Sequence, residues 1–172
     1  MFQTILKILL LLRFLLVKAL EFTVILVTAV LVIDVLWGVF SRYIMKGQSA
    51  WTEELARMLL IWVSLLGASV GFMRKSHLGV DYFVGKLSPK TQIIAQIIVY
   101  LLVIAFVSFA MIYGGITLIS STLEKGQLLQ TLGFEKGYVY LALPISGFFI
   151  VIFSIETIIK NIISLFSKPS PE

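Results

Sequence analysis

The sequence predicts an all-α membrane protein with four transmembrane helices. Of its 172 residues, 59% are hydrophobic and 13% are charged, whereas soluble domains average about 45–50% apolar and about 25% charged residues. The mean hydropathy is +1.04. The apolar residues form continuous runs, whereas the strands of a membrane β-barrel would alternate apolar and polar positions. This composition excludes a water-soluble globular enzyme.

Four apolar stretches are each long enough to cross a bilayer, which requires about 20 residues per helix. The first contains one mid-span acidic residue, Asp34, and a short polar turn at residues 46–49 separates it from the second. The third begins after Pro89, and the fourth continues past Glu156 and Lys160. We expect a single domain, residues 1–172, with spans at residues 17–45, 51–73, 91–118 and 137–166.

Two further segments flank these spans. Lys7, Arg13 and Lys18 interrupt the first apolar run, so we interpret residues 1–16 as the lead-in to an uncleaved helix rather than as a signal peptide. Residues 77–88 mix apolar and polar side chains between the second and third spans. This pattern predicts a short helix that lies on the inner face of the membrane.

The positions of the basic residues predict the orientation of the chain. Of the 14 Lys and Arg residues, nine fall in the N-terminal segment, the second connection and the C-terminal tail, and five fall on the opposite side. Cytoplasmic segments of membrane proteins carry the excess of Lys and Arg. Both termini are therefore predicted to be cytoplasmic.

The residue types present exclude several kinds of chemistry. The chain has no cysteine and one histidine, which excludes a disulfide framework, a thiol nucleophile, an iron–sulfur cluster and a structural zinc site. A Gly-x-Ser-x-Gly match at Gly67–Gly71 falls in the middle of a span, whereas a hydrolase needs this motif at a strand–turn–helix corner. We expect no catalytic residue, no cofactor and no metal site.

Charged residues near the connection between the first two spans are the leading candidates for function. Asp34 lies at membrane depth, where an ionisable group needs a partner or a role. If the first two spans form an antiparallel hairpin, Arg57 lies within one helical turn of the membrane depth of Asp34. Arg42 then faces Glu53 or Glu54. These charges could form structural ion pairs or dock a helix of a partner. A third possibility is that Asp34 relays protons.

Two other groups of residues are candidates for contacts with other molecules. Trp51 precedes the second span as an interfacial anchor, and Gly67 and Gly71 belong to a stripe of small residues with Ser64 and Ala68. Small residues let helix backbones approach closely, so this face is predicted to meet another helix. The second group is an inner-face cluster of charged residues that suits solvent, a helix cap or lipid headgroups, namely Arg74, His77 and Asp81.

Three segments resemble the small membrane subunit of tripartite ATP-independent periplasmic (TRAP) transporters, the DctQ-like subunit. They are Trp51-x-Glu53-Glu54-x-x-Arg57 with the apolar helix after it, Arg74-x-x-His77-x-x-Val80-Asp81, and Leu132-Gly-Phe followed by Tyr138-x-Tyr140-x-Ala-Leu-Pro144-x-x-Gly147. The resemblance covers roughly residues 22–147, and the order and spacing of the three segments make it fairly specific.

The resemblance implies a non-catalytic scaffold subunit in a bacterial inner membrane. It implies a heterodimer with a large membrane subunit, which holds the substrate and sodium sites and moves them in an elevator fashion. It also implies a soluble periplasmic protein that captures an organic acid anion, of the sialic acid or C4-dicarboxylate type, and delivers it to the outer face. Membrane lipid is the remaining partner, and nucleic acid is not expected.

Two other functions remain open from the residues. The first is a self-sufficient, proton-coupled exporter that acts as a homodimer through Asp34. The asymmetric distribution of basic residues disfavours it, because dual-topology exporters show almost no such bias. The second is a haem-anchoring subunit of an enzyme, in which His77 is the only available axial ligand. Four helices with a single mid-span acid form a poor solute pathway, and this favours the scaffold subunit.

Overall fold

The computed structural model describes residues 2–45, 47, 49–74 and 88–166. Within these ranges, four helices are long and apolar enough to span a membrane, and no strand is present. The first two are α1 (Phe2–Ile44) and α2 (Ala50–Met73). The all-helical membrane fold predicted from the sequence is therefore confirmed.

The third and fourth helices are each built from consecutive segments. The third consists of α4 (Pro89–Phe106), the π-helix η1 (Val107–Tyr113) and α5 (Gly114–Glu124). The fourth consists of α6 (Gly137–Tyr140) and α7 (Ala142–Phe166). Ser88 caps α4, because its side chain accepts a hydrogen bond from the backbone N–H of Thr91 at 3.4 Å.

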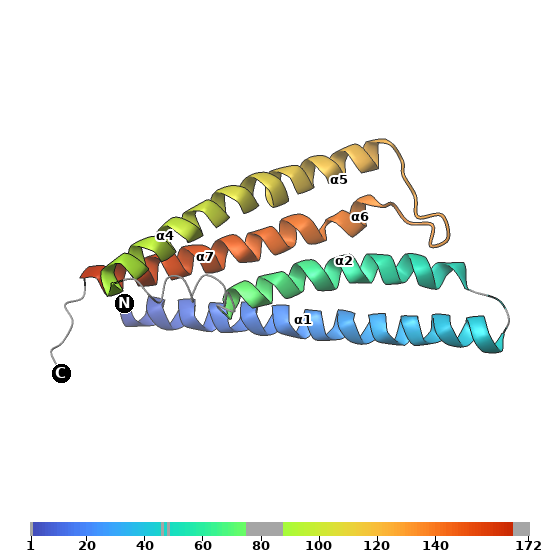
Figure 1. The fold of residues 1–172 in the computed structure, drawn as a ribbon, viewed down its shortest axis with the longest axis horizontal. Coiled ribbons are helices and arrows are strands. Elements are labelled where there is room, and N and C mark those ends of the chain that lie inside the picture. Colours follow the sequence, from blue (N-terminus) through green and yellow to red (C-terminus); the bar gives the residue numbers. More distant parts are fainter. Residues whose placement is uncertain (1, 46, 48, 75–87, 167–172) are drawn as a thin grey trace.

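The helices lie side by side in the order α1, α2, α7 and α4–η1–α5 (Figure 1). We call the end with the α1–α2 turn and residues 125–136 the loop end, and the opposite end the terminal end. Helix α1 begins and α7 finishes at the terminal end (Figure 1). The start of α1 and the end of α7 thus lie on one side of the bundle, and the cytoplasmic location of that side stays a prediction.

The helices extend beyond the spans expected from hydropathy. Helix α1 is continuous from Phe2 and is 43 residues long, so the expected lead-in is the first part of the same helix. The third helix continues through η1 to Glu124. Residues 77–87, where we expected the interfacial helix, lie outside the described residues.

The buried core joins α1, α2 and α7. Leu20, Leu66 and Phe153 form its centre, one residue from each helix. In the most apolar stretch of the fourth helix, 39% of the residues are buried, whereas in that of α1 only 6% are buried. Helix α7 is therefore central, and most of the apolar surface of α1 faces lipid or another protein, because neither alternative exposes it to water.

Hydrogen bonds from polar side chains of one helix to groups on a neighbouring helix also hold the bundle together. Ser69 on α2 is fully buried and donates to the carbonyl oxygens of Leu65 at 3.2 Å and of Ser146 on α7 at 3.1 Å. Asn161 on α7 donates to Oε1 of Gln96 on α4 at 3.1 Å. Polar side chains between transmembrane helices act as such links.

Gly147 lets η1 and α7 approach closely. A Cβ atom at this position would lie 3.0 Å from Ile112 and 3.1 Å from Met111, which is tighter than an ordinary van der Waals contact. The absence of a side chain thus brings the two backbones together, as small residues do in other membrane bundles.

Candidate functional site: the charged loop end of α1 and α2

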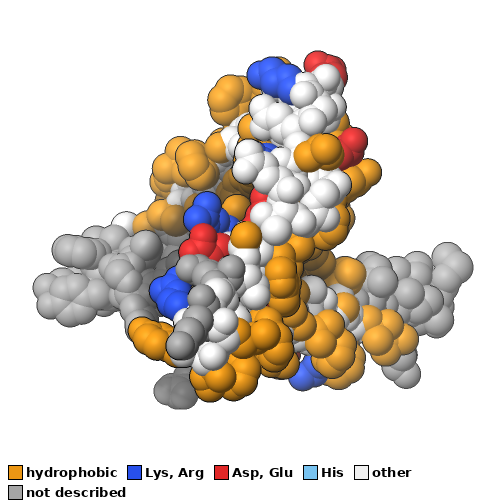
Figure 2. All heavy atoms as spheres, turned by 90° about the vertical axis from the view of Figure 1, so that its right-hand side faces the viewer, with side chains coloured by type: hydrophobic (Ala, Val, Ile, Leu, Met, Phe, Trp, Pro, Cys, Tyr) orange, Lys and Arg blue, Asp and Glu red, His pale blue; other side chains and the backbone are white. Residues whose placement is uncertain are grey.

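The loop end gathers charged side chains, whereas the flanks of the bundle are mainly apolar (Figure 2). Helices α1 and α2 approach closely here. A Cβ atom on Gly38 of α1 would lie 3.1 Å from Oγ1 of Thr52 on α2. Thr52 lies in the first turn of α2, and its hydroxyl donates a hydrogen bond of 2.7 Å to the carbonyl oxygen of Ser49.

Glu53 lies between two arginines. Its Oε1 is 3.9 Å from Nη2 of Arg42 on α1, and its Oε2 is 3.5 Å from Nη2 of Arg57 one turn further along α2. The first contact confirms the predicted pairing of Arg42 with the acidic start of the second helix. All three side chains are more than half exposed, and ion pairs of this kind contribute little to stability.

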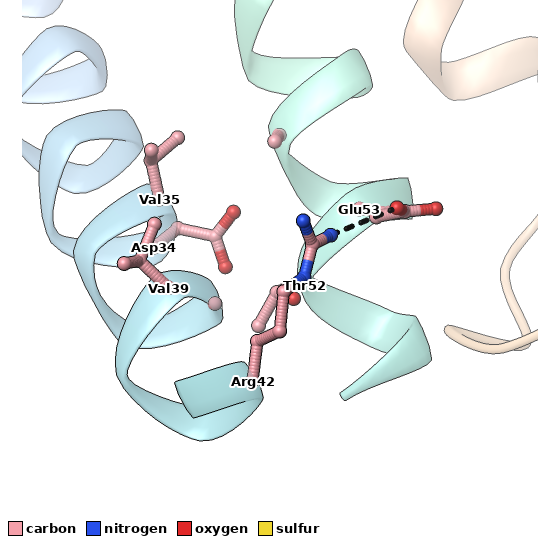
Figure 3. Close-up of a pocket in the computed structure, with 8 residues that line it drawn as sticks. Asp34, Val35, Val39, Arg42, Thr52 and Glu53 are labelled. Atoms are coloured by element: carbon pink, nitrogen blue, oxygen red, sulfur yellow. Dashed lines mark ion pairs between the residues drawn. The ribbon is translucent and has the colours of Figure 1, made fainter. Parts of the chain in front are cut away.

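The predicted ion pair between Asp34 and Arg57 is wrong. Asp34 is 4% exposed, and neither carboxylate oxygen has a hydrogen-bond partner among the described residues. It points from α1 toward α2 (Figure 3). At this end of the hairpin, Thr52 of α2 faces α1. Arg57 lies five residues further along α2, about 140° around the helix. The Arg57 side chain is 79% exposed and binds Glu53 instead.

Asp34 faces a cavity of about 170 Å³ between α1 and α2, which we call the Asp34 cavity (Figure 3). Its walls come from both helices and consist of Asp34, Val35, Gly38, Val39, Arg42, Thr52, Glu53 and Ala56. A buried carboxylate with no partner is rare in proteins and requires an explanation.

Glu54 has a role that the sequence did not predict. Its carboxylate accepts hydrogen bonds from three consecutive backbone N–H groups, those of Gln130 at 2.9 Å, Thr131 at 2.8 Å and Leu132 at 3.1 Å. It therefore holds the loop between α5 and α6 against the N-terminal part of α2. No side-chain pattern reveals this contact, because all three donors belong to the backbone.

Among the described residues, no other helix packs against the two glycines of the small-residue stripe. A Cβ atom added at Gly67 or Gly71 would find nothing within 4 Å. Ser69, which lies between them in sequence, is the residue that α7 buries. The stripe is thus rotated away from the core of the bundle. Trp51, in the first turn of α2, is 40% exposed.

One residue of the predicted inner-face cluster is described. Arg74, which follows α2, binds Glu21 of α1 through Nη2 and Oε1 at 2.8 Å, so it links the two helices at the terminal end. His77 and Asp81 lie outside the described residues. In the part of the chain that the structure describes, no three His, Cys, Asp or Glu side chains are grouped to hold a metal ion.

Together, the fold and the charged loop end define a multi-pass membrane protein. The family model for tripartite ATP-independent periplasmic transporters, DctQ component, matches residues 31–163. The chain belongs to this family, and the resemblance found in the sequence is confirmed. It is therefore a small permease component of a TRAP transporter.

Named relatives come from several bacteria. The chain is 28% identical over 124 residues to the sialic acid TRAP transporter small permease protein SiaQ of Vibrio cholerae. The matched region covers 71% of this chain and 69% of that protein. A putative TRAP transporter small permease protein of Haemophilus influenzae is 30% identical over 149 residues, covering 87% and 91%. The isethionate TRAP transporter permease protein DctMQ of Oleidesulfovibrio alaskensis is 30% identical over 121 residues, covering 68% and 19%.

Proposed function

We propose that this chain is the non-catalytic scaffold subunit of a sodium-coupled TRAP importer of an organic acid anion in a bacterial inner membrane. The family match over residues 31–163 carries the proposal. The large permease subunit provides the path for the solute and the sodium sites, and a periplasmic binding protein delivers the anion.

The distribution of polar side chains supports a scaffold role. Ser69 and Asn161, which are buried within the spans, bind groups on neighbouring helices. Such side chains fasten helices together and are not free to bind a passing solute. Transporter solute sites instead use broken helices whose backbone groups face a cavity near the middle of the membrane.

The relatives support a partnership with a large permease subunit. In DctMQ, the matching stretch covers 19% of a much longer permease protein. A fused polypeptide of this kind contains the small and large parts in equal number, so we infer one copy of this chain per large subunit. The relatives are named for sialic acid and isethionate, and both are organic acid anions, which supports this class of cargo.

Co-purification tests the partnership. The chain, with an affinity tag, is expressed together with the large permease subunit, extracted in a mild detergent and weighed by native mass spectrometry. We expect a complex with one copy of each subunit. A small chain that elutes without the large subunit, as a monomer or a homo-oligomer, would contradict the proposal.

One observation favours a second candidate function, a homodimeric proton-coupled exporter. Asp34 is buried and has no hydrogen-bond partner among the described residues, as a proton-carrying acid could be. In proteoliposomes that contain this chain alone, an exporter would show efflux driven by a proton gradient, and Asp34→Asn would abolish it. The scaffold function predicts no such efflux from either protein.

A further inference from the structure

Five residues of α2 form an unoccupied face, which we call the open seam. They are Ala56, Leu60, Ser64, Gly67 and Gly71, and their spacing of three or four residues places them on one side of the helix. Leu60 is 56% exposed, and Ser64 is exposed as well. Space for a side chain is open at both glycines. The face therefore lacks a neighbour within the described chain.

The open seam leads to the Asp34 cavity. Ala56, the first residue of the seam, also lines the cavity. Val35 and Val39, on the α1 side of the cavity, are about half exposed at 47% and 51%. The cavity is thus bordered by the flank of the α1–α2 hairpin that a neighbouring helix would cover.

Asp34 is the charged residue of the cavity whose carboxylate has no hydrogen-bond partner among the described residues. Asp34 is an acidic group at membrane depth, where ionisable side chains pair with one another or with other polar groups. Arg42, which also lines the cavity, and Arg57 are both bound to Glu53. The cavity volume of about 170 Å³ exceeds the ~30 Å³ that one water occupies in the liquid, so it has room for the end of a long side chain.

We propose that the open seam and the Asp34 cavity receive one transmembrane helix of the large permease subunit, with a Lys or Arg of that helix in the cavity on the side of Asp34. This inference rests on the proposed function. Small residues along the seam let the partner backbone approach closely. A basic side chain on a helix brings positive charge to this depth, whereas a free cation would need several more oxygen ligands than the Asp34 carboxylate offers.

Photo-crosslinking locates the docked helix. A photo-reactive phenylalanine analogue replaces Leu60, the large exposed residue of the seam, and, as a control, Ala105, an exposed residue of α4. In the co-expressed complex, we expect position 60 to crosslink to the large subunit at least tenfold more than position 105. A crosslink between two copies of this chain at position 60 would overturn the inference in favour of a homodimer.

Bulky substitutions test the seam without disturbing the fold of the chain. We expect the double variant Gly67→Leu, Gly71→Leu to lower the co-purified large subunit at least tenfold, because leucine fills the space that the partner backbone needs. The isolated variant should fold normally, since no atom of the described chain lies within 4 Å of either Cβ position. Ala105→Leu is the matched control. Equal retention of the large subunit by the double variant and the control would refute the seam.

Charge exchange tests the Asp34 cavity. We expect Asp34→Asn to weaken the complex and Asp34→Arg to abolish it. Replacement of the crosslinked helix's basic residue by Glu should restore the complex with Asp34→Arg. Unchanged complex formation by Asp34→Asn would refute the charge pairing. If even the wild-type chain forms no complex, the proposed function fails with the inference, whereas a complex that crosslinks elsewhere refutes the inference alone.

Discussion

The backbone N–H of Thr131 donates a hydrogen bond of 2.8 Å to Oε2 of Glu54, although 77 residues separate the two in the sequence. Two neighbouring N–H groups bind the same carboxylate. A single side chain at the start of α2 therefore holds the loop between α5 and α6 in place. The loop end of the bundle is thereby fixed as one surface, built from segments that are distant in sequence.

Removal of the Glu54 carboxylate should release this loop. We expect Glu54→Ala to accelerate hydrogen exchange of the amides of residues 130–132 by roughly tenfold or more, because each loses a charge-assisted hydrogen bond. Hydrogen exchange followed by mass spectrometry measures this change. Glu124→Ala, at the exposed end of α5, is the control and should leave these amides unchanged. Equal exchange rates in both variants would show that the loop between α5 and α6 stays ordered without the Glu54 carboxylate.

Arg57→Ala should have little effect on the isolated chain. The sequence-level hypothesis of an Asp34–Arg57 pair predicts a loss of several kcal/mol, because removal of one partner strands a buried charge. Arg57 instead binds the exposed Glu53, so we expect a change in unfolding free energy of less than about 1 kcal/mol. Unfolding of the purified chain by SDS in mixed micelles measures the difference. A loss of several kcal/mol in unfolding free energy would instead support an ion pair between Asp34 and Arg57.

Ser69 and Ser64 lie on the same helix and should respond differently to loss of the hydroxyl. We expect Ser69→Ala to lower the unfolding free energy of the isolated chain by about 1 kcal/mol, because the link to the Ser146 carbonyl is lost. Ser64→Ala should be neutral, since Ser64 is exposed. The same SDS titration compares the two variants, and similar losses would mean that the helix is rotated differently in solution.

Glycines of α7 and α2 provide a second matched pair. Gly147→Leu should destabilise the isolated chain by about 1–3 kcal/mol, because its side chain would overlap Ile112 and Met111 of η1. Gly71→Leu should not destabilise it, because no atom lies within 4 Å of its Cβ position. Thermal unfolding of both variants in one detergent is the measurement. A stable Gly147→Leu chain would argue against close packing of η1 on α7.

The hydrogen bond between Gln96 and Asn161 links α4 to α7. A double-mutant cycle with Gln96→Ala and Asn161→Ala should give a coupling energy of about 0.6 kcal/mol and no more than about 1.7 kcal/mol, the range known for such bonds in membranes. Unfolding of the wild-type chain, the two single variants and the double variant supplies the four free energies. Additive losses would mean that the two side chains do not interact.

Much of the fold could be predicted because hydrophobic runs of membrane length have few alternatives. The turn between the first two spans also fixed the register that brings Arg42 to Glu53. What could not be predicted was the rotation of each helix about its axis, since one residue changes the direction of a side chain by about 100°. For this reason Asp34 was assigned to Arg57, whereas the structure pairs Arg57 with Glu53.

Contacts that depend on the backbone or on fine packing were also missed. Glu54 looked like a partner for Arg42, and its actual donors are the main-chain N–H groups of Gln130, Thr131 and Leu132. These donors carry no signal in the sequence. Ser69 was one of several small residues on α2, and only the position of α7 distinguishes it from Ser64.

The central claim is that this chain supports a solute path which lies in another subunit. The most direct measurement is uptake of a radiolabelled organic acid anion into proteoliposomes under an inward sodium gradient, with the binding protein outside. The anion is chosen by its binding to that protein. We predict uptake when both membrane subunits are present, and background values when either is omitted. Uptake by this chain without the large subunit, or full uptake by the large subunit without this chain, would contradict the account.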